Sequence, residues 1–148
     1  MHAQHMQRAL EEAKRALELG EVPVGAVVVC GGEVIASAHN EREATGDPTA
    51  HAEVLAIRRA AKRLGRRRLT GCTLYVTLEP CPMCAGAIVM AELGSVYYGA
   101  ADETAGCAGS VYAIPEDPAF GRRIACMGGL LEGECKEILD GFFEERRG

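Results

Sequence analysis

A continuous run of mostly β-branched residues, VGAVVVC at 24–30, constrains the fold of this chain most strongly. A strand of that composition is buried on both faces, so it needs a covering layer above and below. Gly31 and Gly32 follow as a tight turn, and EVIASAH at 33–39 has the composition of an antiparallel partner strand. The sequence therefore predicts a hairpin that starts a sheet in the interior of the protein.

Helices and strands are predicted to alternate through the rest of the chain. The first twenty residues predict an amphipathic helix with Met6, Leu10, Ala13 and Leu17 along one apolar stripe. Further helices are expected from about Thr49 to Leu64, from Cys81 to about Leu93 and at 133–146, and further strands at 73–78, 95–100 and 122–128. This order predicts one α/β domain over residues 1–148, with a mixed five-stranded sheet covered by helices on both faces.

The composition excludes several classes of protein. Of the 148 residues, 48% are hydrophobic and 25% are charged, which is typical of a globular domain and not of a disordered chain. No apolar run approaches the roughly 18–20 residues that cross a bilayer, so no membrane partner is expected. The net charge of −5 argues against a non-specific nucleic-acid binder, because such proteins usually carry a basic surface.

Seven cysteines, an odd number, are scattered through the chain, and the first twenty residues lack the apolar core of a signal peptide. We therefore expect a reduced, cytoplasmic protein without a disulfide framework. Cys30, Cys72, Cys126 and Cys135 are expected to be small hydrophobic core residues.

The segment EPCPMC at 79–84 places two cysteines three residues apart at the start of a predicted helix. A redox dithiol, a structural zinc site and a catalytic metal centre can all contain such a pair. A thioredoxin-like motif would come early in the chain, whereas this one follows a hairpin and a helix. A metal site needs further ligands. His51 lies just inside another predicted helix and supplies one, whereas His2 and His5 are expected on a solvated helix face.

His51, Cys81 and Cys84 form the predicted metal-binding set. Zn²⁺ favours thiolate and imidazole ligands, and helix N-termini stabilise thiolates because they carry partial positive charge. Three protein ligands leave a fourth position for water, which is typical of a catalytic zinc ion. A structural zinc site would need a fourth protein ligand, and neither Cys72 nor Cys107 has ligand-like spacing.

Glu53 follows His51 by two residues, so their side chains diverge by about 200° on a helix and Glu53 is not a natural co-ligand. A carboxylate beside the metal, but not bound to it, suits a general base for a bound water. Two thiolates already cancel the charge of Zn²⁺, so the ion alone lowers the pKa of its water less than it would with three neutral histidines. Glu53 is therefore the predicted catalytic residue.

HAE at 51–53 and PCPMC at 80–84 together resemble the signature of the zinc-dependent cytidine and adenosine deaminases. Other segments extend the resemblance to the bacterial tRNA adenosine deaminases over nearly the whole chain. They are EVPVGAVVV, DPTAHAE, TLYVTLEPCPMCAGA, GAADETAGCAGS and, as the C-terminal helix, GFFEERR.

The resemblance implies a three-layer α/β/α cytidine-deaminase-like fold, one Zn²⁺ per subunit and a homodimer. It implies hydrolytic conversion of the wobble adenosine of a tRNA anticodon to inosine by a zinc-bound hydroxide, with Glu53 as proton shuttle. The implied partner is therefore a tRNA anticodon stem-loop. By position, the resemblance assigns Asn40 to contact with the target base, Asp102 to the neighbourhood of the ribose, and Val24 to the pocket wall.

Two groups of residues have alternative interpretations. Phe142 and Phe143 are neighbours near Arg146 on the last predicted helix; either can pack in the core, or one can stack on an unpaired loop base. The basic cluster at 62–68 either complements the dipole of a helix C-terminus or follows an RNA backbone.

Two other functions stay open. Bacterial guanine deaminases share DPTAHAE and PCPMC, and the acidic net charge suits a free purine, whereas EVPVGAV, TLEPC and GAADETAGCAGS favour the tRNA enzymes. A deaminase-like zinc module that binds a partner without catalysis is the second alternative. The presence of Glu53 argues against it, because a silent module has no use for an unligated carboxylate there.

Overall fold

The computed structural model of the chain describes residues 1–147. Five strands form one sheet in the order β2-β1-β3-β4-β5. β1 pairs antiparallel with β2 and β3, whereas β4 pairs parallel with β3 and β5, which confirms the predicted mixed sheet. The strands are β1 (Gly25–Cys30), β2 (Glu33–His39), β3 (Cys72–Leu78), β4 (Ser95–Ala100) and β5 (Ala125–Met127).

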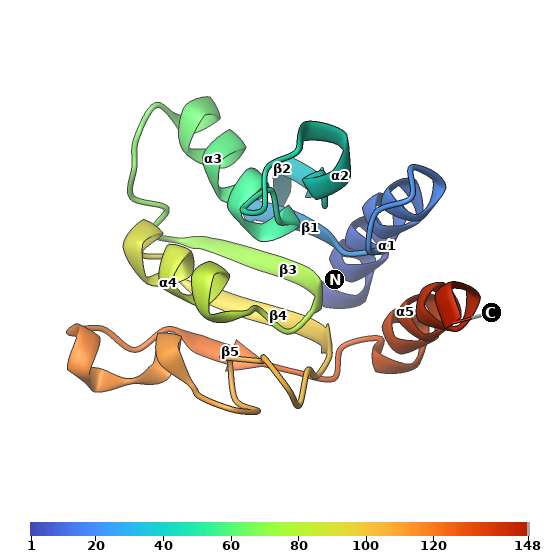
Figure 1. Ribbon diagram of the computed structural model, residues 1–148. Coiled ribbons are helices and arrows are strands. Elements are labelled where there is room, and N and C mark those ends of the chain that lie inside the picture. The colour runs from blue at the N-terminus through green and yellow to red at the C-terminus, as the bar shows by residue number, and fades with distance from the viewer. Residues whose placement is uncertain (148) are drawn as a thin grey trace.

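Helices cover both faces of this sheet, which confirms the predicted α/β/α layers (Figure 1). Successive residues of a strand point to opposite faces. Tyr75 of β3 points toward the first helix, where its hydroxyl contacts His2, so Leu74 and Val76 point to the other face. The helices are α1 (His2–Glu18) and α5 (Glu132–Arg147) on one face, α3 (Ala52–Leu64) and α4 (Pro82–Ala91) on the other, and the short α2 (Arg42–Thr45) after β2.

α1 packs unusually close to β1, and a glycine makes this possible. A Cβ atom at Gly25 would lie 2.0 Å from the carbonyl oxygen of Ala9, so only glycine fits at this position. Met6, Leu10 and Ala13 are buried against the sheet as predicted, but Leu17 of the same predicted stripe is 37% exposed. Leu17 lies in the last turn of α1, beside a groove between α1 and α5.

Two predicted boundaries differ from the structure. The helix expected from Thr49 begins at Ala52, and His51 precedes it as the N-cap residue with extended backbone (φ −80°, ψ 148°). The backbone of His51 thus belongs to the loop before α3. The last strand is limited to Ala125–Met127, whereas the sequence predicts a strand over 122–128.

One further boundary differs slightly, and His2 makes contacts that the sequence does not predict. The helix expected to reach Leu93 ends two residues earlier, because Glu92 adopts a left-handed conformation (φ 54°) that terminates it. His2 is exposed, as expected, but its ring also stacks on Tyr97 with 4.3 Å between centroids, and its Nδ1 lies 2.6 Å from the hydroxyl of Tyr75. The N-terminal turn of α1 is therefore held on the sheet by aromatic contacts.

The short helix α2 is not predicted by the sequence. It has only four residues, which is too few for a helix to be stable by itself. The buried carboxylate of Glu21 accepts hydrogen bonds from the backbone N–H groups of Glu43 (3.0 Å) and Ala44 (2.8 Å). A carboxylate at a helix N-terminus is favourable, so Glu21 fixes the loop that carries α2.

All seven cysteines lie within the described residues and are free thiols, in agreement with the absence of a disulfide framework. Cys72 and Cys135 are buried in the core, whereas Cys30 and Cys126 are only partly buried. Within residues 1–147, no helix combines the length and the apolar character that crossing a bilayer requires.

Candidate active site

The N-termini of α3 and α4 converge on one histidine and two cysteines. His51 is the N-cap residue of α3, Cys81 is the N-cap residue of α4, and Cys84 lies in the first turn of α4. Their ligand atoms all lie within 4.8 Å of one another. The structure therefore brings together the three residues that the sequence predicts as a metal-binding set, although 30 residues separate the histidine from the first cysteine.

The distances within this triad fit a tetrahedral zinc ion. Nδ1 of His51 lies 3.6 Å from Sγ of Cys81 and 3.5 Å from Sγ of Cys84. Bonds of about 2.0–2.1 Å to nitrogen and about 2.3 Å to sulfur, at tetrahedral angles, require N–S separations of about 3.5–3.6 Å. His51 is oriented to bind through Nδ1, so the three residues of the triad suit the zinc ion that the sequence predicts.

The electrostatics of the triad favour a thiolate at Cys81. A hydrogen bond from the Cys84 thiol, together with one from His51, lowers the pKa of Cys81 to about 4. The hydrogen bond to Cys81 raises the pKa of His51, and the same partner together with burial raises the pKa of Cys84. The protons are thus shared within one cluster, and a divalent cation would displace them, because metal ligands bind deprotonated.

Glu53, in the first turn of α3, is buried beside the triad. The group of ligand atoms within 4.8 Å consists of His51, Cys81 and Cys84, so Glu53 stands outside it among the described residues. Burial raises the pKa of the Glu53 carboxyl to about 7. Both of its protonation states are therefore accessible near neutral pH, as a group that accepts and then returns a proton requires.

A small cavity of about 70 Å³ lies beside the triad. It is lined by Val24, Asn40, Asp102 and Glu53, together with His51 and Cys81 of the triad. This volume equals about two water molecules. All three predicted substrate-binding residues, far apart in sequence, thus meet at one cavity. The remaining lining residues are Val22, Arg42, Leu78 and Glu79.

Asn40 and Asp102 already make hydrogen bonds within the protein. The side-chain oxygen of Asn40 accepts from the N–H of Ala52 (2.8 Å), and its amide nitrogen donates to the carbonyl of Val22 (3.1 Å). Asn40 therefore links the start of α3 to the segment before β1. The carboxylate of Asp102 accepts from the backbone and hydroxyl of Thr104, which holds its own loop in a turn.

Sequence reasoning missed two charged residues at this cavity. Arg42 is the one lysine or arginine among the described residues that line it, and it is carried by the unpredicted helix α2. Glu79 follows β3 and is almost fully buried. A charged residue between a buried strand and a proline is the signal that could have identified Glu79, whereas the polar loop gives no signal for Arg42.

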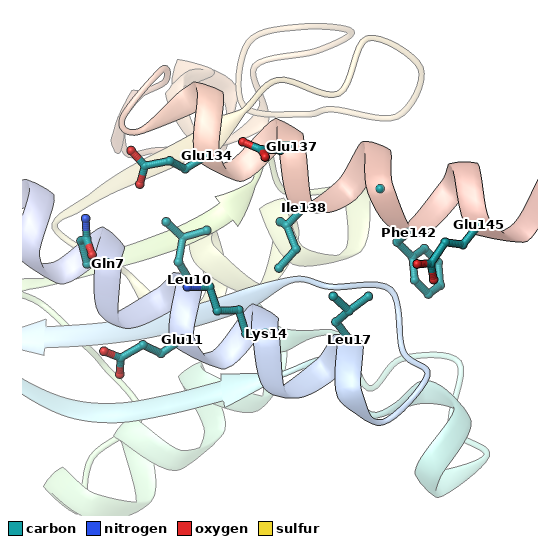
Figure 2. A pocket seen from close by; sticks show the side chains of 11 residues that line it. Gln7, Leu10, Glu11, Lys14, Leu17, Glu134, Glu137, Ile138, Phe142 and Glu145 are labelled. Carbon is teal, nitrogen blue, oxygen red and sulfur yellow. The ribbon is translucent and has the colours of Figure 1, made fainter.

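A larger groove lies between α1 and α5 (Figure 2), and its described lining residues do not include the triad. Its volume is about 760 Å³, and its apolar side chains, Leu10, Leu17, Ile138 and Phe142, lie between the two helices. Charged side chains around it are mostly acidic: Glu11, Glu134, Glu137 and Glu145, with Lys14 the one cation among the described lining residues. Such a rim repels phosphate groups, so the small cavity at the triad is the candidate active site despite its size.

The three aromatic and basic residues predicted near the C-terminus differ in their surroundings. Phe142 is 7% exposed, and the guanidinium of Arg146 lies 4.4 Å from the centre of its ring. Arg146 also donates to the carbonyl of Gly20 (2.9 Å), so both side chains are engaged within the protein. Phe143 is 44% exposed.

The basic cluster at 62–68 makes local contacts. Arg63 donates to the carbonyl of Ile35, and the guanidinium of Arg68 forms an ion pair with Glu92 (3.0 Å). These two side chains therefore link the end of α3 and the following loop to β2 and to the end of α4.

One histidine, two cysteines and an adjacent unligated glutamate, held by two helix N-termini over a mixed sheet, define the class of the nucleobase deaminases. Comparisons with known proteins agree. The family model described as MafB19-like deaminase matches residues 1–147. The tRNA-specific adenosine deaminase of Bacillus subtilis (strain 168) is 50% identical over 143 residues, which is 97% of this chain and 89% of that protein.

Two solved structures extend the comparison. A tRNA:A34 deaminase, studied for A-to-I editing at the wobble position of transfer RNA, is 46% identical with a TM-score of 0.88, covering 92% of this chain and 99% of its own. A guanine deaminase from Bacillus subtilis is 45% identical with a TM-score of 0.66, but covers only 68% of this chain and 65% of its own. The chain belongs to the MafB19-like deaminases and, within them, to the family of the tRNA-specific adenosine deaminases.

Proposed function

We propose that this protein hydrolyses adenosine to inosine at the wobble position of a tRNA anticodon. The relatives named tRNA-specific adenosine deaminase support this proposal, because they match nearly the whole chain at 42–50% identity. The observation that carries it is the triad of His51, Cys81 and Cys84 beside the buried Glu53, which supplies the metal ligands and the proton carrier that such a reaction needs.

The metal in this proposal is one Zn²⁺ per subunit, held by His51, Cys81 and Cys84. When bound, the ion would activate a water molecule for attack on C6 of the base. Glu53 would accept one proton of that water and deliver it to N1 of the purine. It would then accept the second proton, from the hydroxyl group newly bonded to C6, and pass it to the amino group, so that ammonia leaves and inosine is formed. Asn40 and Val24 hold the base, and Asp102 lies near the ribose.

One experiment separates this function from its alternatives. The purified, zinc-loaded protein is incubated with an anticodon stem-loop that carries a wobble adenosine, and separately with free guanine, adenosine and cytidine. We expect inosine in the stem-loop alone. Xanthine from guanine would replace the proposal with the free-purine alternative, and the absence of any product would identify a silent zinc module.

We propose that Phe143 of the C-terminal helix contacts RNA directly, and that Phe142 and Arg146 support it from within the protein. Its exposed ring is available to stack on an unpaired base, which contributes about 1–3 kcal/mol in single-strand binders. Phe143→Ala should therefore raise KM for the stem-loop at least about fivefold and leave the melting temperature unchanged.

Phe142→Ala is the matched control. Its ring is buried, so its removal should lower stability by about 3–5 kcal/mol, measured by denaturant unfolding. An unchanged KM in Phe143→Ala would exclude a stacking role for this residue.

We also propose a homodimer that forms through α4. The helix PMCAGAIVMA has no charged residue, and Met90 on it is 76% exposed. Met90→Glu should convert the dimer to a monomer of 15.7 kDa, because it places an unpaired charge in an apolar interface. Light scattering measures the mass, and Leu19→Glu, at an exposed apolar residue outside α4, should stay dimeric. A dimeric Met90→Glu protein would contradict this interface.

The proposed reaction requires tRNA, so we propose that the protein acts in the cytoplasm. Residues 1–148 act as one deaminase domain in this proposal, with no membrane partner.

A further inference from the structure

Glu79 is a buried carboxylate that the mechanism does not use. It follows β3, two residues before the metal ligand Cys81, and is 2% exposed. Its side chain lies between the segment that leads to Cys81 and the loop 101–110, which follows β4. Donors from three residues of that loop surround it: the N–H of Asp102 (3.0 Å), the N–H of Ala108 (3.0 Å), and both the N–H (2.9 Å) and the hydroxyl of Ser110.

These four hydrogen bonds saturate the carboxylate. Oε1 accepts from Asp102 N–H and the Ser110 hydroxyl, and Oε2 accepts from the N–H groups of Ala108 and Ser110. An ionised carboxylate has about four lone-pair sites, so none is left for a substrate. Glu79 can therefore influence a reaction only through the loop that it holds.

The loop is shaped to close around this side chain. A Cβ atom at Gly106 would lie 2.4 Å from the carboxyl carbon of Glu79, so a larger residue would push the loop away. The N–H of Cys107 donates to the carbonyl of Pro80 (2.8 Å), which adds a backbone link to the same segment. Loop 101–110 and the start of α4 thus form one connected unit, and Asp102 in that loop lines the cavity.

We infer that Glu79 is a positioning residue: it fixes loop 101–110 so that Asp102 stands at the mouth of the cavity, where the nucleotide binds. The inference rests on the proposed function for the identity of the substrate. It assigns Glu79 to substrate binding and not to the chemical step, because its contacts are with the loop and not with the triad.

Glu79→Gln tests this inference, because an amide keeps the size of the side chain but offers one oxygen and turns an NH₂ group toward two donors. We expect the amides of Asp102, Ala108 and Ser110 to exchange with deuterium at least about tenfold faster. KM for the stem-loop should rise about tenfold, with kcat within about threefold and one zinc ion retained per chain.

Glu12→Gln is the matched control. Glu12 is also a buried carboxylate, but it lies on α1 and is paired with Arg8 (2.8 Å) and Arg15 (3.0 Å). Glu12→Gln should lower the melting temperature of the protein. It should leave KM for the stem-loop and the deuterium exchange of the amides in loop 101–110 unchanged. Ser110→Ala, which removes one of the four bonds, should give a smaller KM rise of about two- to threefold.

Unchanged amide exchange or an unchanged KM in Glu79→Gln would overturn the inference, as would an equal KM change in Glu12→Gln. If the wild-type protein leaves the stem-loop unmodified, the proposed function fails. The exchange rates then decide alone whether Glu79 holds the loop, since they need no substrate.

Discussion

Glu53→Ala should retain its metal and lower kcat for the stem-loop by about 10²–10⁴-fold, the range that a positioned acid–base group contributes. The carboxyl lies beside the triad and outside its ligand atoms, so its removal takes away the proposed proton carrier and leaves the three proposed ligands intact. Single-turnover kinetics give the rate, and metal analysis gives the zinc content. Glu53→Gln should lose as much, because an amide cannot carry the proton.

The stability of Glu53→Ala separates chemistry from folding. Burial of this carboxyl is unfavourable, as its raised pKa indicates, so the melting temperature should stay equal or rise. Glu43→Ala, at an exposed acid of α2, should behave as the wild type does. A Glu53→Ala protein with kcat within threefold of wild type would remove Glu53 from the mechanism.

Cys84→Ala should lose zinc and lower activity by at least about 10³-fold. It removes one of the three proposed ligands and leaves a two-ligand site, whereas a catalytic zinc ion requires three. Because metal binding stabilises the folded state, the melting temperature should also fall. Treatment of the wild-type protein with a chelator should have the same two effects, and added Zn²⁺ should reverse them.

Cys107→Ala is the control for this prediction and tests the structural-zinc alternative. The thiol of Cys107 donates to the carbonyl of Ala105 (3.6 Å) and lies outside the group of His51, Cys81 and Cys84. The variant should keep one zinc ion per chain and near wild-type activity. Loss of zinc from Cys107→Ala would mean a fourth protein ligand and therefore a closed, structural site.

Two buried glutamates illustrate what sequence patterns miss. Glu21 and Glu79 are both buried and both accept hydrogen bonds from the backbone of a distant loop. Through these bonds they fix α2, which carries Arg42, and loop 101–110, which carries Asp102. Neither role follows from the local sequence, because the donors are 22 to 31 residues away along the chain.

The sequence alone determined the features that depend on neighbours within a few residues. Periodicity predicted the hairpin, five strands and four of the five helices, and the three-residue cysteine spacing at a helix start predicted two ligands on one side of that helix. The expectation that Glu53 is not a co-ligand agrees with the ligand group, but its helical argument does not apply, because His51 precedes α3 with an extended backbone.

Only the tertiary structure showed that the distant residues proposed for the site lie together. The pairing of β3 with β1 and β4 places the start of α4 beside that of α3, so His51 meets the two cysteines, and Asn40 and Asp102 reach the same cavity. Packing also decided that Phe142 is buried between α1 and α5, whereas its neighbour Phe143 is exposed. These outcomes depend on sheet order and on which helix faces find a partner, and contacts of that range leave no periodic pattern in the chain.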